Sequence, residues 1–312
     1  MEAAVPEDVL ACLFLDTADI QKAGWMRPPG AREIRYEVRE QRVDRSLVTT
    51  SSRRQEQRPT VARFALASDT VQADTRPRLT QVLHVAETTR KALMSRARDD
   101  DGTTSPLFSG KSADGEPLQN HRHAYYIPCD DDNDGRIDHL VVYAREGFGE
   151  RERNALMLVR KLWQHRNAPD LFPVLLGLGD PADFDAGGGP RATSCLDSAR
   201  IWISRTPYLA ARHSKSNGKD SIDEQVRREL ASIGLPEPVF VSLANRGTAT
   251  DRKLIRWSEF ARVRKRGGGR PATTRGYGVR IEFSVKVRGP IALGYGAHFG
   301  LGSFVPEPTV SA

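Results

Sequence analysis

The order of hydrophobic periodicities between residues 60 and 180 constrains the fold of this chain more than any other feature. Short apolar or alternating runs predict strands at residues 61–66, 121–127, 137–144 and 172–178. Apolar residues three or four positions apart predict helices at residues 78–94 and 150–165. The resulting order, β-α-β-β-α-β, is that of a ferredoxin-like domain.

A looser copy of the same order follows. Strands are predicted at residues 200–204, 239–243 and 279–287, and a helix at residues 221–232. A second helix is not evident in this copy, and a glycine-rich segment, residues 294–302, stands where that helix or its following strand should be. We therefore predict an α+β fold of tandem ferredoxin-like (RRM-like) domains with a C-terminal glycine-rich loop.

The predicted boundaries follow from composition. Residues 1–59 are an N-terminal arm and mobile linker, because residues 41–60 have almost nothing to bury. Residues 60–180 form the first domain, residues 181–198 a linker, and residues 199–312 the second domain with a basic loop and the glycine-rich loop. A length of 312 residues suits about two domains.

The positive charge is concentrated in one segment. The chain carries +7 overall, yet residues 251–288 hold twelve basic and three acidic residues, so the remainder is slightly acidic. Such a stripe is typical of proteins that neutralise phosphates. The alternative is a solvated charged face, which usually mixes both signs. The candidate phosphate contacts, which are nucleic-acid contacts if the partner is a nucleic acid, are Arg252, Lys253, Arg256, Arg262, Arg264, Lys265, Arg266, Arg270, Arg275, Arg280 and Lys286.

Three widely spaced cysteines give neither a disulfide framework nor a zinc cluster, which suits a reducing compartment. The sequence has no apolar run of about 20 residues and no secretory leader pattern. We expect a cytoplasmic protein. No motif implies a cofactor.

The glycine-rich segment can approach a partner closely through its backbone. Gly294, Gly296, Gly300 and Gly302 allow positive φ, and the neighbouring basic segment favours phosphate contact through backbone N–H groups. A plain turn is the alternative. His298 lies inside this segment and is a further candidate contact for the same nucleic-acid partner.

Two histidines are the strongest candidates for acid–base chemistry. His121 and His123 lie two apart on a predicted strand, so both point to one face of the sheet, with Tyr125 beyond them. The alternative is a pair of hydrogen-bonded structural histidines. His84, on the first predicted helix, is a further candidate base, and Lys111 a candidate cation.

The acidic turn between two predicted strands resembles a calcium-binding loop. Asp130, Asp132, Asp134, Gly135 and Asp138 match positions 1, 3, 5, 6 and 9 of an EF-hand loop. Position 12, which should be glutamate, is a valine, and strands rather than helices flank the turn. A tight β-turn is therefore favoured over a calcium site, and no metal ligand set is assigned.

Several motifs together resemble a known family. The chain resembles the RAMP-type endoribonucleases of CRISPR systems, and more narrowly the processing half of the fused backbone-plus-endonuclease subunit of type I-U (I-G) systems. The resemblance runs from about Trp25 to the end. The fused proteins carry a further RAMP-like half in front, so we expect a fragment, a split subunit or a trimmed chain. The motifs are Ser109-Gly110-Lys111, Asp114-Gly115, His121-Arg122-His123-Ala124, Asp134-Gly135-Arg136-Ile137-Asp138-His139 and the segment from Gly294 to Phe304.

The resemblance implies metal-independent cleavage of precursor crRNA, in which a base activates the ribose 2′-hydroxyl. The products are a cyclic phosphate and a 5′-hydroxyl, and the protein stays on the 3′ repeat hairpin inside a type I interference complex with a backbone subunit. His121 and His123 would supply base and acid, with Tyr125 and Lys111 positioning and neutralising the phosphate. Two alternatives stay open: a non-catalytic crRNA-binding cap, and a metal-dependent hydrolase that uses His121 and His123.

Overall fold

The structure is a computed structural model in two units, Met1–Glu56 and Gln57–Ala312. In the first unit, α1 (Thr17–Lys22) begins after Asp16, whose side chain accepts a hydrogen bond from the Asp19 backbone N–H at 2.9 Å. The unit boundary lies three residues before the predicted end of the arm at residue 59. The residues described are 15–24, 58–68, 75–112, 114–118, 122–163, 169–185, 193–213, 218, 220–244, 246–264 and 272–308.

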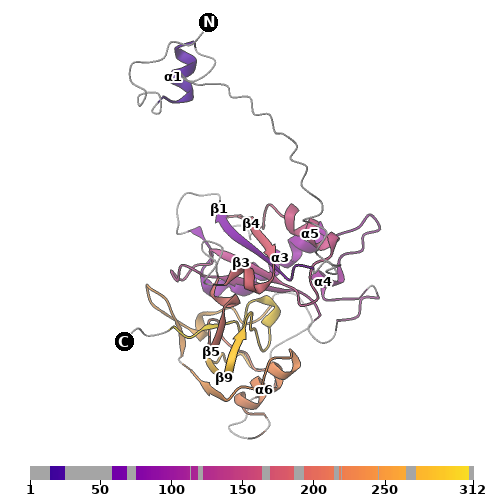
Figure 1. The fold of residues 1–312 in the computed structure, drawn as a ribbon, viewed down its shortest axis with the longest axis vertical. Helices are drawn as coiled ribbons and strands as arrows, with labels where there is room; N and C mark the ends of the chain where they lie inside the picture. Colours follow the sequence, from indigo (N-terminus) through magenta and orange to yellow (C-terminus); the bar gives the residue numbers. More distant parts are fainter. Residues whose placement is uncertain are drawn as a thin grey trace, which may run out of the picture. The chain divides into compact units, whose positions relative to one another are not determined.

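The first sheet has the predicted ferredoxin-like topology (Figure 1). Its strands are β1 (Val61–Ser68), β2 (Tyr125–Cys129), β3 (His139–Tyr143) and β4 (Leu171–Gly179). They are antiparallel in the order β2-β3-β1-β4. The two connecting helices are α3 (Val82–Arg96), preceded by the 3-10 turn η3 (Leu79–Gln81), and α5 (Glu150–Leu158).

The second sheet repeats this strand order with one helix fewer. Its strands are β5 (Ser198–Ser204), β6 (Phe240–Leu243), β9 (Val279–Arg288) and β10 (Phe304–Pro306), ordered β10-β5-β9-β6. α6 (Ile222–Ser232) begins where the Ser221 hydroxyl accepts the Glu224 N–H at 3.3 Å. The glycine-rich segment, with the 3-10 turn η8 (Ala297–Phe299), replaces the second helix. The predicted tandem ferredoxin-like class is confirmed.

Strands β1, β2 and β3 of the first sheet are largely buried on both faces, whereas the edge strand β4 is mostly half-buried. Phe64 and Tyr126 point toward α3 and α5 and belong to the largest apolar core. On the other face, Val61 and Ile127 pack with Leu196 from the start of the second half. The first core also takes in Leu209, Ile255, Trp257, Phe260, Phe299 and Leu301. The second half of the chain therefore completes the core of the first.

Several predicted bounds were wrong for local reasons. β2 begins at Tyr125 rather than at residue 121, because the Ala124 N–H donates to the Leu107 carbonyl outside the sheet. α5 ends at Leu158 rather than at residue 165, because Val159 is extended (ψ 120°) and Leu162 pairs with Leu171. Short elements occupy predicted loops: α4 (Pro106–Ser109), η4 (Pro181–Phe184), η6 (Ser194–Leu196), β7 (Gly247–Ala249), β8 (Leu254–Arg256) and η7 (Trp257–Glu259).

The acidic turn between β2 and β3 is tied into the fold by arginines. The Arg76 guanidinium lies 3.2–3.3 Å from the carboxylates of Asp132 and Asp134, and Arg205 lies 2.7 Å from Asp130. Burial raises the pKa of Asp130 to about 7, against the opposing charge of Arg205. The turn closes through Gly135, whose N–H donates to Asp130 at 3.0 Å.

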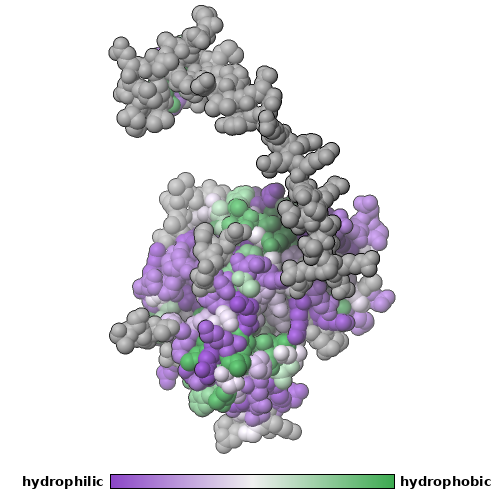
Figure 2. Space-filling model, in the orientation of Figure 1, coloured by the Kyte–Doolittle hydropathy of each residue, from purple (hydrophilic) through white to green (hydrophobic). Residues whose placement is uncertain are grey.

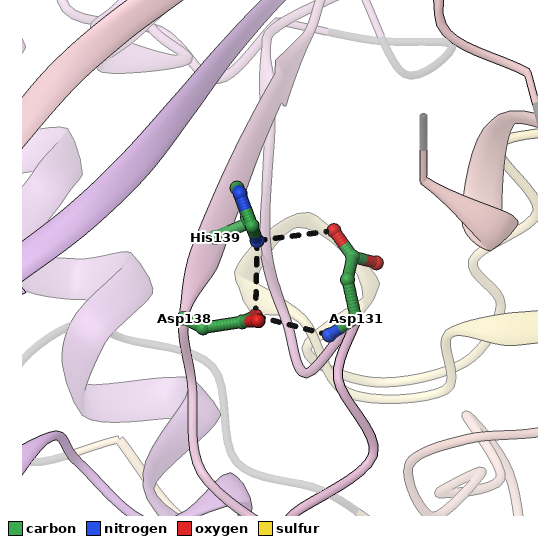
Figure 3. A group of neighbouring side chains, drawn as sticks. All are labelled: Asp131, Asp138 and His139. Atoms are coloured by element: carbon green, nitrogen blue, oxygen red, sulfur yellow. Dashed lines mark hydrogen bonds and ion pairs between the residues drawn. The ribbon is translucent and has the colours of Figure 1, made fainter. Parts of the chain in front are cut away.

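Asp131 joins four parts of the chain. Its carboxylate lies 2.7 Å from Arg63 of β1 and 3.3 Å from His139 Nδ1 of β3, and accepts the Thr193 hydroxyl at 2.7 Å. Figure 3 shows His139 between Asp131 and Asp138, and Asp138 also accepts the Asp131 N–H at 3.0 Å. Arg63 is only 1% exposed, so this ion pair is shielded from water.

The surface of the second unit mixes hydrophilic areas with apolar patches, as Figure 2 shows for one face. Val239, Phe240 and Leu243, on and beside the edge strand β6, are each more than half exposed. In the part of the chain that the structure describes, no helix is both long and apolar enough to cross a bilayer.

Replacing Arg63 by Met should lower the free energy of unfolding by about 3–5 kcal/mol, because Asp131 would be left as a buried charge without its cation. Arg96→Met makes the same exchange at an exposed position at the end of α3 and should change stability by less than about 0.5 kcal/mol. Urea unfolding at neutral pH measures both. Equal effects of the two variants would contradict a structural role for the pair.

Candidate active site at the glycine-rich loop

Three aromatic rings from distant parts of the sequence form a stack. The ring of His298 lies between those of His123 and Tyr125, with centroid distances of 3.6 Å and 3.8 Å and interplanar angles of 17° and 22°. Both histidines are partly exposed, whereas Tyr125 is 7% exposed. The stack is therefore open to solvent at its histidine end and closed at its tyrosine end.

The segment around α4 supports His123. Gly110 ends α4 in the left-handed region (φ 70°), and a Cβ on Gly110 would lie 3.3 Å from the His123 ring. The Phe108 carbonyl, two residues earlier, accepts hydrogen bonds from Arg90 Nε at 3.0 Å and from the Tyr126 hydroxyl at 3.1 Å. These buried bonds fix the backbone against which His123 packs.

The glycine-rich loop supports His298 by folding on itself. Gly294, Gly296, Gly300 and Gly302 all have positive φ. A Cβ at Gly302 would lie 1.9 Å from the Leu293 carbonyl oxygen, so no larger residue fits there. N–H groups that donate within the protein are those of Gly294, Tyr295, Ala297, Phe299, Gly300, Leu301 and Gly302. These groups are consequently not available to a phosphate, and the loop instead shapes the chain around His298.

A half-buried carboxylate anchors the start of the loop. Glu229 of α6 accepts the Gly294 N–H on one oxygen and the Tyr208 hydroxyl, at 2.9 Å, on the other. Burial raises the pKa of Glu229, while these two donors oppose the rise. Sequence patterns gave no signal for this residue, because an acidic residue on an amphipathic helix is expected on the solvated face.

A backbone carbonyl defines the protonation of His298. Nδ1 of His298 lies 3.2 Å from the Ala124 carbonyl oxygen. A carbonyl oxygen only accepts hydrogen bonds, so Nδ1 carries the proton. In neutral His298 the lone pair is then on Nε2, which is the arrangement that a general base requires.

Tyr125 has a different chemical character. Burial raises the pKa of its hydroxyl well above the ordinary value, with the neighbouring Tyr143 adding to the rise and Arg145 opposing it. The hydroxyl therefore stays protonated near neutral pH. Tyr125 can stack and donate a hydrogen bond, but it cannot serve as a base.

The other predicted catalytic residues are dispersed. Lys111 is exposed and directly follows Gly110, which places it beside His123 in the chain. His84 is half-buried on α3. His121 lies outside the described residues, so its pairing with His123 on one strand face stays a prediction; His123 itself precedes β2. The ring of His298 contacts that of His123. From the sequence, His298 was predicted to be an RNA contact rather than a catalytic residue.

The basic candidates differ in how closely acidic side chains of the protein pair with them and in how exposed they are. Arg264 is paired with Glu87 at 2.8 Å, lies 4.1 Å over the Phe299 ring, and is 21% exposed. Arg280 contacts Glu282 and Glu307, both at 3.0 Å. Arg252 and Lys253 are 60% and 62% exposed; Arg252 lies 3.7 Å from Asp134, and Lys253 lies 3.9 Å from Glu259.

The remaining basic candidates either make other contacts within the protein or are exposed. Arg262 donates to the Thr274 carbonyl, Arg275 lies 5.1 Å over the Tyr277 ring, and Arg256 and Lys286 are exposed. Lys265, Arg266 and Arg270 lie outside the described residues.

Two acidic groups have atoms close enough to hold a metal ion, among the residues that the structure describes. They are Asp131 with Asp138 and His139, and Asp130 with Asp132 and Asp134. Both groups belong to the acidic turn, where arginines already form ion pairs with the aspartates. Neither group includes His123 or His298.

No protein-family model and no curated protein matches this sequence. One solved structure, described as "Csf5, CRISPR-Cas type IV Cas6 crRNA endonuclease", is similar with 10% sequence identity and a TM-score of 0.29. The match covers 80% of this chain and 98% of that chain. A TM-score of this size does not establish a shared fold, so the fold assignment rests on the strand order of the two sheets.

Proposed function

We propose that the chain is an endoribonuclease that cleaves CRISPR repeat RNA without a metal ion. The observation that carries the proposal is the contact between His298, whose Nε2 bears the lone pair, and His123, at a partly exposed site. Two adjacent imidazoles meet the need of this reaction for one base and one acid. The tandem ferredoxin-like fold, the +9 segment at residues 251–288 and the family resemblance of the sequence motifs support RNA as the substrate.

The proposed reaction needs only groups of the protein and the RNA. His298 Nε2 removes the proton from a ribose 2′-hydroxyl, and the 2′-oxygen attacks the adjacent phosphorus. The bond to the 5′-oxygen breaks, and protonated His123 supplies the proton to that leaving oxygen. The products are a 2′,3′-cyclic phosphate and a 5′-hydroxyl. Lys111 stabilises the charge that develops on the phosphate.

The same proposal covers the partners. The exposed cations Arg252, Lys253 and Arg275 bind phosphates of the repeat hairpin, and Lys265, Arg266 and Arg270 extend this contact. The protein then remains on the 3′ hairpin of the product within a type I interference complex in the cytoplasm. β6, which is the edge strand of the second sheet among the described residues, exposes Phe240 and Leu243 and would contact another subunit.

Cleavage should depend on His298 but RNA binding should not. His298→Phe keeps a ring in the stack and removes both nitrogens, so single-turnover cleavage of the repeat transcript in EDTA should fall by about 10²–10⁴-fold. The dissociation constant should change less than about threefold. His123→Phe should behave alike, and His213→Phe, at an exposed position outside the stack, should match the wild type.

The other outcomes separate the alternatives. Tight binding of the repeat transcript with no cleavage by the wild type would identify a crRNA-binding cap. Cleavage that requires an added divalent ion would identify a metal-dependent hydrolase. Either result, or full activity of His298→Phe, would contradict the proposed mechanism.

The exposed cations should contribute to affinity through counterion release. The triple variant Arg252→Gln, Lys253→Gln and Arg256→Gln should weaken binding and reduce the slope of log affinity against log salt by about two, since each phosphate contact contributes about 0.7–0.9. The control variant neutralises three other exposed residues, Arg96, Arg98 and Arg160. Arg96 and Arg98 lie at the C-terminal end of α3, about 20 Å from Val82 at its start, where the glycine-rich loop packs. Equal slopes in both triple variants would remove residues 252–256 from the interface.

A further inference from the structure

A cavity of about 130 Å³ lies beside the ring stack. It is on the side of Tyr125 that faces away from His298. Tyr125 and Tyr143, from β2 and β3, form one wall. Leu235, from the segment after α6, and Arg288, from the end of β9, also line it. The cavity therefore lies where the first sheet meets the second half of the chain.

The walls combine flat aromatic surface with positive charge. The rings of Tyr125 and Tyr143 are 6.0 Å apart and tilted by 45°, and Ile127 and Leu235 add apolar surface. Burial raises the pKa of Tyr143, so both hydroxyls remain neutral hydrogen-bonding groups. Aromatic and apolar walls with a few polar groups are typical of sites that hold an unpaired nucleobase.

Arg145 supplies the charge at the cavity. It is exposed, and the described part of the chain shows no acidic group paired with it, whereas Arg288 is 3.1 Å from Asp185. Arg145 lines the cavity together with both tyrosines, and its charge opposes the rise in the pKa of their hydroxyls. A Cβ added to Gly234 would lie 2.9 Å from Arg145 Nη2, so glycine at this position leaves room for the guanidinium.

We propose that this cavity binds the base of one unpaired nucleotide next to the cleaved bond, while Arg145 binds a phosphate of the same strand. The inference rests on the proposed function, because it concerns the same RNA. Tyr125 contacts His298 on one side and lines the cavity on the other, so the bound base belongs to a nucleotide within about two positions of the reacting ribose. A cavity of about 130 Å³ is below the usual size of cofactor pockets, about 300–1,000 Å³, and suits a single base.

The pocket gives the proposed enzyme a way to choose its cleavage position. A duplex keeps its bases stacked inside, so only an unpaired nucleotide can place a base between Tyr143 and Leu235. Binding of that base would hold the neighbouring ribose beside His298. The cut would then fall at a fixed distance from the unpaired position, whatever the sequence of the hairpin that the cations bind.

An abasic scan of the repeat transcript tests this inference. One ribose at a time loses its base across the six positions around the cut, and single-turnover cleavage in EDTA is measured. We expect one position at which the abasic site slows cleavage or weakens binding about tenfold, the range given by base–aromatic stacking. In Tyr143→Leu this penalty should fall below about threefold. Tyr277→Leu makes the same exchange outside the cavity and should keep the full penalty.

A second measurement uses the unaltered protein, in case Tyr143→Leu does not fold. 4-Thiouridine placed at the sensitive position should crosslink to the peptide that contains Tyr143 or Leu235. Cleavage with a flat abasic scan would overturn the base pocket and leave the proposed function intact. A crosslink only to other peptides would also overturn the pocket. If the transcript is neither bound nor cut, the proposed function fails, and the pocket assignment fails with it.

Discussion

The carboxylate of Asp131 is the point on which the two halves of the second unit depend. It contacts Arg63 in the middle of the first sheet, His139 on the neighbouring strand and Thr193 on the segment that enters the second half. Because Arg63 is buried, its charge needs this one partner. The pair thereby fixes β1, β3 and the entry to the second half in one arrangement.

That arrangement determines where the candidate catalytic rings meet. β2 ends at the acidic turn and begins at Tyr125, so the position of the turn sets the position of the tyrosine. His298 arrives from the far end of the sequence on a loop whose N–H groups are mostly satisfied within the protein and whose start is held by Glu229. The stack is therefore built on rigid support rather than on a mobile loop, as catalysis by positioned groups requires. In the proposed complex, side chains such as Arg252, Lys253 and Arg145 bind the phosphates.

The sequence predicted the fold class well because period-two and period-3.6 patterns are local. The four strands and two helices of the first copy follow from those patterns, as do three strands of the second copy and its missing second helix. The fourth strand of the second sheet, β10, is only three residues long and was not predicted. Their limits were harder to predict: β2 starts late because Ala124 bonds to Leu107, and α5 stops early because Leu162 pairs with Leu171. Neither contact leaves a signal in hydrophobic periodicity.

The residue types of the candidate site could be predicted from the sequence, but the contacts between those residues could not. Histidine and the phenol of Tyr125 were expected from the chemistry, and the structure brings His123 and Tyr125 into one stack. That His298 joins them could not be deduced, because 174 residues separate it from Ala124, the carbonyl that sets its tautomer. The glycines were interpreted as a phosphate cradle, but positive φ is needed here for packing against Leu209, Leu293 and Pro128. The paired state of Arg264 likewise depends on Glu87, from α3.

The most direct measurement of the central claim is the pH dependence of single-turnover cleavage of the repeat transcript in EDTA. The proposed mechanism requires one histidine to be neutral and the other to be protonated in the same molecule. It therefore predicts a bell-shaped profile in which the rate falls on both the acid and the alkaline side. A rate that continues to rise with pH, or that appears only when a divalent ion is added, would contradict the assignment of His298 and His123 as base and acid.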